Sequence, residues 1–266
     1  PLAAALAKVN VPCVYRSEQR CVECHSRNLE YRALHLKYLR LDKSLVRKNG
    51  RHIVVLIGDA ATISSEGVLA KLRNLFLYGI LGAASYSEAT LVDSGLATSW
   101  GVCQPAPSME DYCRNVMHVG VTPGGVVEAL SKWHSHQIIM NDFDSWDDRP
   151  RDAAWTKFAL VRRVNGRRCR AVCVLANDGH AALDEAYAAC AEGIPIVVMK
   201  GSGGLADDLA AALAIGNAPS SVFGDWTGRV QEMLASRCLY VFDMDGEGSE
   251  HKKRATLMAM VRCHLM

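Results

Sequence analysis

Short apolar runs alternate with helix-like segments along the chain from about residue 51 onward. The runs that predict strands are 52–57, 89–92, 117–121, 137–140, 171–176 and 196–200. They lack the apolar–polar alternation of a half-exposed strand, so we expect both faces of each to be covered, as in a parallel sheet. Helices are expected at 67–78, 181–191 and 205–215. The pattern predicts an α/β fold, a Rossmann-like open, mainly parallel sheet with helices on both faces.

The two ends of the chain differ from this pattern. Leu29–Lys48 is basic and amphipathic, which predicts a helix that packs on the main domain or on a partner. Residues 1–50 are therefore expected to form a basic, helical N-terminal extension, followed by one domain at 51–266. Near the end of that domain, the apolar run 239–242 and the segment 251–263 predict an edge strand and a terminal helix, with a solvated acidic loop between them.

Composition narrows the class of protein. The chain has 266 residues, 50% of them hydrophobic, so it can bury a large core without disulfides. A net charge of +2 without a basic stripe argues against nucleic acid as a partner. Several of the ten cysteines lie inside apolar segments and no signal peptide precedes them, which favours a reducing, intracellular compartment, the cytoplasm rather than an organelle. No apolar run approaches the roughly 20 residues of a membrane span.

The start at Pro1 rather than Met is consistent with a processed or trimmed chain, from which a targeting segment could already have been removed.

The loops after the strands are polar or rich in glycine, and ligands of such folds bind at strand-end loops. Gly201-Ser202-Gly203-Gly204 leads into a helix with Asp207 in its first turn. Because glycine permits close backbone approach and a helix N-terminus attracts anions, this loop is a candidate anion cradle. A tight turn without a ligand is the alternative.

The order of these loops resembles a known family. The succession HIVVLIGDA, ATLVDSGLATSWG, HVGVTPGG, HSHQIIM, VLANDGHAALDEA and IPIVVMKGSGGLADDLA is similar to the SLOG superfamily, in the branch found at the N-terminus of melastatin-type transient receptor potential channels and in prokaryotic sensor proteins. The resemblance covers about residues 51–215. It implies a non-catalytic domain that binds or senses a nucleotide-derived ligand, such as ADP-ribose or a nucleoside phosphate. The binding residues that it implies are Gly58, Asp59, Asp93, Ser94, Gly95, Thr122, Gly124, Gly125, His134, His136, Asn177, Gly179, Gly201, Ser202, Gly203, Gly204 and Asp207.

Two loops depart from the family pattern. Gly58-Asp59 stands where family members have a double glycine, and Asp93-Ser94-Gly95-Leu96 replaces a D-G-G-T-like loop. An aspartate beside a phosphate repels it unless a metal intervenes. These departures favour a second interpretation, a structural subunit with a decayed pocket. In that interpretation the N-terminal helix or the C-terminal region binds a protein partner or a second copy of the chain.

A third interpretation is a nucleotide phosphoribohydrolase. Enzymes of this kind in the same superfamily carry P-G-G-x-G-T-x-x-E, whereas residues 177–185 keep only Gly179 and Glu185 of that motif. The string Pro123-Gly124-Gly125-Val126-Val127-Glu128 lacks the Gly-Thr step, and Glu128 is expected on a solvated helix face. We therefore expect no catalytic residues.

Two small motifs have metal-ligand spacing. Cys21-Val22-Glu23-Cys24-His25 fits the attachment site of a c-type haem, or zinc together with Cys13. No cytochrome-like domain surrounds it, so ordinary thiols and no cofactor are expected. In His134-Ser135-His136 both imidazoles would lie on one side of a strand, as a metal pair, as part of the ligand loop or in a structural hydrogen-bonding role.

Overall fold

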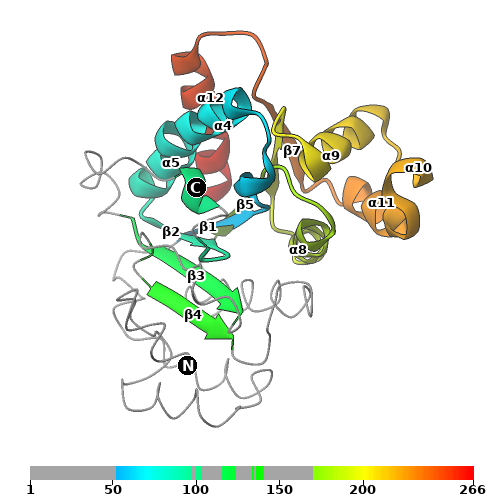
Figure 1. The fold of residues 1–266 in the computed structure, drawn as a ribbon, viewed down its shortest axis with the longest axis horizontal. Coiled ribbons are helices and arrows are strands. Elements are labelled where there is room, and N and C mark those ends of the chain that lie inside the picture. Colours follow the sequence, from blue (N-terminus) through cyan, green and yellow to red (C-terminus); the bar gives the residue numbers. More distant parts are fainter. Residues whose placement is uncertain (1–51, 97–99, 104–115, 124–133, 135, 141–169) are drawn as a thin grey trace.

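The computed structural model describes residues 52–96, 100–103, 116–123, 134, 136–140 and 170–266. Figure 1 shows these parts as a coloured ribbon. Several expectations fall on other residues and lie outside the described ranges. These are the N-terminal helix, the motif at Cys21–His25 with Cys13, the glycines Gly124 and Gly125, and Glu128.

The described strands form a parallel sheet, as the apolar runs predict. Its seven strands lie in the order β4-β3-β2-β1-β5-β6-β7, and each neighbouring pair is parallel. The bounds are β1 His52–Ile57, β2 Ala89–Asp93, β3 His118–Pro123, β4 His136–Met140, β5 Arg170–Leu175, β6 Ile196–Lys200 and β7 Leu239–Asp243. Because the strands are parallel, the loops that follow them gather at one edge.

The chain changes direction at the centre of this sheet. From β1 it proceeds outward through β2 and β3 to β4, and then returns to place β5 on the other side of β1. The register pairs Ile57 at the end of β1 with Leu175 at the end of β5. The connections that leave these two strands lead to α4 and α8 on opposite faces of the sheet, which makes this the topological switch point where open α/β sheets bind ligands.

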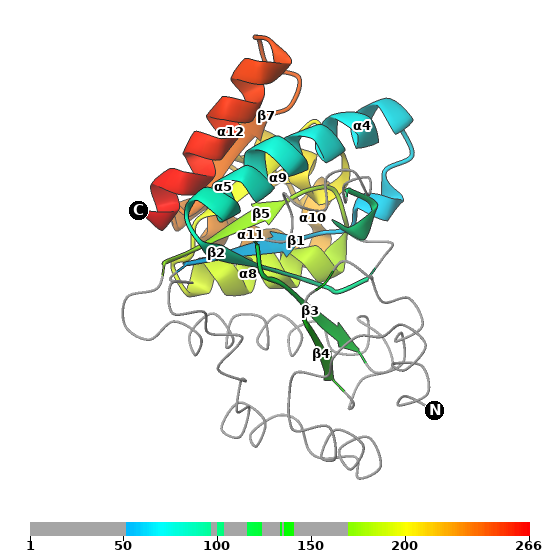
Figure 2. The same cartoon turned by 90° about the vertical axis from the view of Figure 1, so that its left-hand side faces the viewer.

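Helices cover both faces of the sheet. Figure 2 shows one layer above the strands and α8 below them. The upper layer is α4 Glu66–Leu75, α5 Leu81–Tyr86 and α12 Glu250–Leu265. The opposite layer is α8 His180–Ala191, α9 Gly204–Ile215 and α11 Thr227–Ala235, with the short α10 Ser220–Phe223 beside them.

Successive residues of β1 pack alternately against the two helix layers. Ile53 and Val55 belong to the core against α8 and α9, whereas Val54 and Leu56 belong to the core against α4, α5 and α12. All four side chains are buried. This two-sided burial explains why the strand reads as a continuous apolar run, and full burial of each such side chain contributes about 1.5–3 kcal/mol.

The helix expected at 67–78 continues further than predicted. After α4 the chain forms a π-helical turn, Phe76–Ile80, and runs on into α5. Gly79 is buried under α12, where an added Cβ would come 2.8 Å from Cδ2 of Leu257. This glycine permits close packing of two helices, so it does not end the helix.

The remaining boundaries agree with the sequence pattern within a few residues. Three-residue 3₁₀ turns lie at Ala60–Thr62 and Gly224–Trp226, and a longer one at Trp100–Cys103.

Across the described part of the chain, every helix is too short or too polar to cross a membrane.

Candidate functional site

The switch point brings three glycine or polar loops together. They follow β1, β5 and β6, and their backbones touch. A Cβ added to Gly58 would come 2.0 Å from the carbonyl oxygen of Ala176, and one added to Gly204 would come 2.8 Å from that of Asp178. Gly58 also has φ +101°. The glycines therefore permit the loops to pack on one another as well as on any ligand.

Asn177 connects these three loops. Its side-chain amide donates to the carbonyl oxygen of Asp59 at 3.2 Å and also to Oγ1 of Thr62. Its backbone N–H donates to Oγ of Ser202 at 2.8 Å, and that hydroxyl donates to the carbonyl of Met199 at 2.7 Å. Asn177 and Ser202 are buried. The resemblance assigns both residues to the ligand, but the contacts described serve to hold the loops in place.

The candidate anion cradle after β6 already holds a carboxylate of the chain itself. Gly201 and Gly203 donate their N–H groups to Asp207, at 2.5 and 3.2 Å. Leu205 donates to the carbonyl of Asp178 at 2.7 Å, and Ser202 to that of Met199 at 3.2 Å. An external phosphate would have to displace Asp207 to reach the first two amides. These contacts favour the tight-turn alternative for this loop, and its binding role stays a prediction.

The helix after β5 begins differently. α8 starts at His180 after Gly179, no side chain caps it, and its first turn contains no acidic residue. Gly179 is exposed, and nothing lies within 4 Å of a Cβ added there. The helix has 12 residues, so its N-terminus has the usual partial positive charge. Beside the switch point, this helix end has open space around Gly179, although the carboxylate of Asp178 already accepts from the N–H of Gly179 at 2.6 Å.

The glutamate of the hydrolase interpretation lies on the same helix. Glu185 and its neighbour Asp184 are buried, with exposed fractions of 6% and 7%. Asp184 accepts a long hydrogen bond, 3.4 Å, from Arg229 of α11. Gly179 is the N-cap of the helix that carries Glu185, and Glu185 presents little surface to a substrate.

The acidic loop after β7 belongs to the same edge of the sheet. Asp243 pairs with Lys200 at 2.7 Å, and Asp245 pairs with Lys71 of α4 at 2.6 Å. Hydrogen bonding to the partner carboxylate raises the pKa of both lysines, and Lys200 in turn lowers the pKa of Asp243. These side chains are exposed, as expected for a solvated loop, but they are also ion-paired. The sequence pattern did not indicate either lysine.

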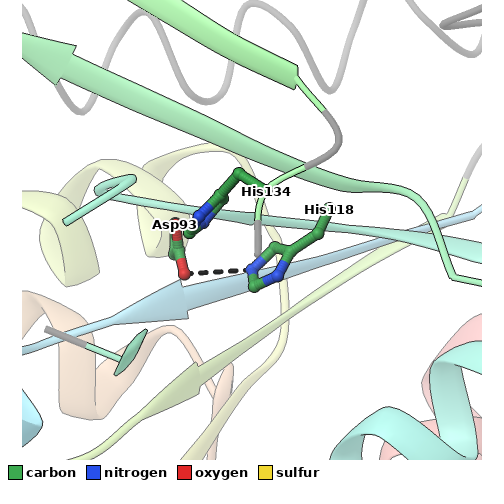
Figure 3. Close-up of side chains that lie close together, drawn as sticks. All are labelled: Asp93, His118 and His134. Atoms are coloured by element: carbon green, nitrogen blue, oxygen red, sulfur yellow. Dashed lines mark hydrogen bonds and ion pairs between the residues drawn. The ribbon is translucent and has the colours of Figure 1, made fainter. Parts of the chain in front are cut away.

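A second cluster lies on the other side of β1. Asp93 ends β2, His118 begins β3 and His134 precedes β4. Asp93 is paired with Gly120 in the register and His118 with Leu91, so the Asp93 and His118 side chains are diagonal neighbours on one face. Figure 3 shows the three side chains converging from these neighbouring strands.

The carboxylate of Asp93 lies between the two imidazoles. Oδ1 is 2.6 Å from Nε2 of His134, and Oδ2 is 3.0 Å from Nε2 of His118. The backbone N–H of Gly95 donates to Oδ1 at 2.7 Å. The imidazole rings lie against one another with centroids 4.0 Å apart. Nδ1 of His134 is buried and has no hydrogen-bond partner among the residues described.

Burial and charge act in opposite directions on this cluster. Asp93 is 0% exposed, and burial by itself would raise its pKa. The charges and hydrogen bonds of His134 and His118 outweigh this effect and hold the pKa of Asp93 well below its usual value. Burial and the neighbouring His134 lower the pKa of His118. The cluster therefore contains an ionised carboxylate next to an imidazole that favours its neutral form.

The other expected site residues are placed as follows. Ser94 and Gly95 follow β2, and Thr122 lies near the end of β3, at the same edge as Gly58. His136 begins β4, and its side chain is not among those described. The sequence grouped His134 with His136, whereas the structure groups it with Asp93 and His118. His118 was not a candidate, because its place near Asp93 depends on the register of two strands.

The fold and this loop-lined edge define a Rossmann-like domain. Residues 51–250 match the family model described as SLOG in TRPM, prokaryote, and the chain belongs to this family. A search of curated proteins found no match. A solved structure titled an X-ray structure of TM1055 is similar at 17% identity and a TM-score of 0.45, over 79% of this chain and 99% of that one.

Proposed function

We propose that this domain binds a nucleotide-derived ligand at the switch point between β1 and β5, with an anionic group over the N-terminus of α8. The observation that carries the proposal is the open start of α8, where Gly179 leaves space and no side chain caps the helix. Family membership and the position beside the switch point supply the ligand class.

α9 offers a weaker place for a phosphate than α8. Asp207 already accepts from the two glycine amides in front of α9, and its charge repels a second anion. Asp245 lies close to the same loop, since its Oδ2 would be 2.9 Å from a Cβ at Gly201. Both carboxylates favour a ligand that approaches from the α8 side of the edge, where Asp178 occupies the N–H of Gly179 but no side chain caps the helix.

Binding without turnover is the form of the proposal that the residues support best. Asp178, Ala181 and Ala182 stand where the hydrolase motif has its glycines and threonine. Without those phosphate-binding residues, the free energy of phosphate binding cannot be used to orient a sugar for cleavage. Glu185, the remaining carboxylate of the motif, is buried. A bound nucleotide would then act as a signal to an associated protein.

The experiment is a thermal-shift screen of the purified chain against ADP-ribose, nucleoside monophosphates, cyclic dinucleotides and inorganic phosphate. A ligand at about 100 times its Kd adds roughly 2.7 kcal/mol to the free energy of unfolding, which raises the melting temperature measurably. No shift with any of these compounds would contradict the proposal and would favour the structural-subunit interpretation.

Gly179→Asp locates the binding site. The position is open, and aspartate is a favourable helix N-cap, so the variant should fold at least as stably as the parent chain. Its carboxylate would occupy the start of α8 and repel an anion, so the ligand-induced shift should disappear. Gly228→Asp is the matched control, because it adds the same charge at an open position on α11. An undiminished shift in Gly179→Asp would move the site away from α8.

A further inference from the structure

The cluster of Asp93, His118 and His134 is not used by the proposed nucleotide site. Each residue offers one ligand atom, and these atoms all lie within 4.8 Å of one another. The two Nε2 atoms and the carboxylate oxygens face each other, as Figure 3 shows. The cluster therefore presents three donor atoms to one small volume.

The ligand distances are close to those of a metal centre. Zinc binds imidazole nitrogen at about 2.0–2.1 Å and carboxylate oxygen at about 2.0–2.2 Å, so donors in a tetrahedral site lie about 3.3 Å apart. The Nε2–O distances to Asp93 are 3.0 Å for His118 and 2.6 Å for His134. A shift of the donor atoms by several tenths of an ångström would admit the ion.

The charge of the cluster favours a cation. Asp93 is a fully buried carboxylate, and the two side chains beside it are imidazoles whose nitrogen atoms can bind a cation. Burial of an uncompensated carboxylate is costly. A divalent cation compensates the carboxylate and uses the lone pairs of the imidazoles at the same time.

The donor types select the kind of ion. Magnesium and calcium prefer oxygen ligands, whereas two imidazoles and one carboxylate suit zinc and other divalent transition metals. The resemblance places Asp93 and His134 in ligand loops but does not include His118, which joins them only through the register of β2 and β3. The site would have three protein ligands, and a water molecule bound together with the ion would complete a tetrahedral centre.

We propose that Asp93, His118 and His134 form a three-ligand site for a divalent transition metal ion such as Zn²⁺. The alternative is a metal-free network in which both histidines donate to Asp93. In that network Nδ1 of His134 is buried without a partner in the described structure, so the hydrogen bonding of this side chain is confined to Asp93. The unpartnered Nδ1 is common to both arrangements, because a metal-bound imidazole also normally donates its other ring N–H, so metal binding itself has to separate them.

The first test uses Co²⁺ as a spectroscopic substitute for Zn²⁺. The purified full chain, treated with chelator and dialysed, should bind one equivalent of Co²⁺ with the visible bands of a four- or five-coordinate ion. Zn²⁺ should displace it and Mg²⁺ should not. The same spectrum should persist in a Cys21→Ser, Cys24→Ser chain. Loss of the bands in that chain would assign the ion to the N-terminal cysteines and would overturn the proposal, as would a chain that binds no Co²⁺.

The second test identifies the ligands by calorimetric titration with Zn²⁺. His118→Gln and His134→Gln keep a hydrogen-bonding side chain, and each should weaken Zn²⁺ binding by on the order of 100-fold or more, since even outer-sphere partners contribute 10–100-fold. His251→Gln, on the exposed side of α12, is the control and should bind as the parent chain does. Unchanged affinity in both cluster variants would overturn the proposal.

A third test uses only the parent chain, so it does not require the variants to fold. X-ray absorption of the zinc-loaded parent chain counts the neighbours of the ion directly, and two imidazoles with oxygen and no sulfur are expected. A sulfur neighbour or a single imidazole would contradict the site. Because this readout needs no nucleotide, failure here leaves the proposed nucleotide site untouched, and failure of the nucleotide screen leaves the metal site untouched.

Discussion

The two sides of β1 organise polar groups in different ways. On the side of β5, β6 and β7, side chains cap nearby backbone groups, as Asp207 does for amides four and six residues before it. On the side of β2, β3 and β4, Asp93 meets histidines that are 25 and 41 residues further along the chain. The Asp207 cap is local and partly exposed, whereas the Asp93 cluster is buried and joins residues from β2, β3 and the segment before β4.

This difference decides how each side responds to mutation. When a local cap is removed, the amides that it bound can form hydrogen bonds with water or with an external anion. A buried carboxylate between two imidazoles has no such substitute, because solvent does not reach it. The following changes test that contrast, beginning with the largest expected effect.

Asp93→Ala should lower the free energy of unfolding by about 3–5 kcal/mol, since it leaves His118 and His134 buried without their shared partner. Denaturant unfolding with chelator present measures this loss apart from any metal. The control is Asp245→Ala, which breaks an exposed pair with Lys71 and should change stability far less. Equal losses in the two variants would contradict the contrast between the two sides.

Asp207→Ala should lower the free energy of unfolding by about 1–2 kcal/mol, because Gly201 and Gly203 lose their acceptor. The N–H groups of Gly201 and Gly203 should then donate to an external anion. Added phosphate should therefore restore part of the loss in the variant and have a smaller effect on the parent chain. The neighbouring, exposed Asp208 supplies the control, since Asp208→Ala should leave stability nearly unchanged. An unchanged free energy of unfolding in Asp207→Ala would show that the cap contributes little to stability.

The buried thiols predict a dependence on alkaline pH. Burial raises the pKa of Cys103 to about 12 and that of Cys190 to about 12, above the roughly 8.5 of an unfolded cysteine. The folded chain then holds protons that the unfolded chain releases, so stability is full below pH 8.5 and falls as pH rises toward 12. Denaturant midpoints measured from pH 8 to 10 should decline, and the decline should be shallower in Cys103→Ala.

The same burial protects these thiols from alkylation. At pH 8, iodoacetamide with mass spectrometry should modify the exposed Cys263 and leave Cys103 and Cys190 intact. The two protected thiols lie on opposite faces of the sheet, so equal protection would show that both cores exclude solvent alike. Rapid labelling of Cys103 alone would indicate that the core against α4, α5 and α12 opens more easily.

The smallest expected effect is the absence of turnover. The purified chain should release no free base from nucleoside monophosphates above the uncatalysed background, because residues 177–185 lack the phosphate grip of the hydrolase motif. Chromatography of the reaction mixture measures the base. Turnover that disappears in Glu185→Gln would assign catalysis to α8 and would replace the binding proposal with the enzyme interpretation.

The local pattern of apolar residues was sufficient to predict most of the fold. The apolar runs located six strands, and the further run at 239–242 located the seventh, because strands covered on both faces must be continuously apolar. The glycine loops were also visible, and family membership followed from their order. The helix that passes Gly79 was missed, since only the approach of Leu257 from α12 explains a glycine inside a helix.

Sequence by itself determined the strands, their loops and the family, since each depends on residues that are close together in the chain. Only the tertiary structure decided that Asn177 joins the loops at Gly58 and Ser202, and that His118 and His134 meet at Asp93. Such contacts depend on strand order and register, which bring distant residues together. The spacing of residues along the chain does not encode them, because burial of apolar faces over the whole sheet sets the register.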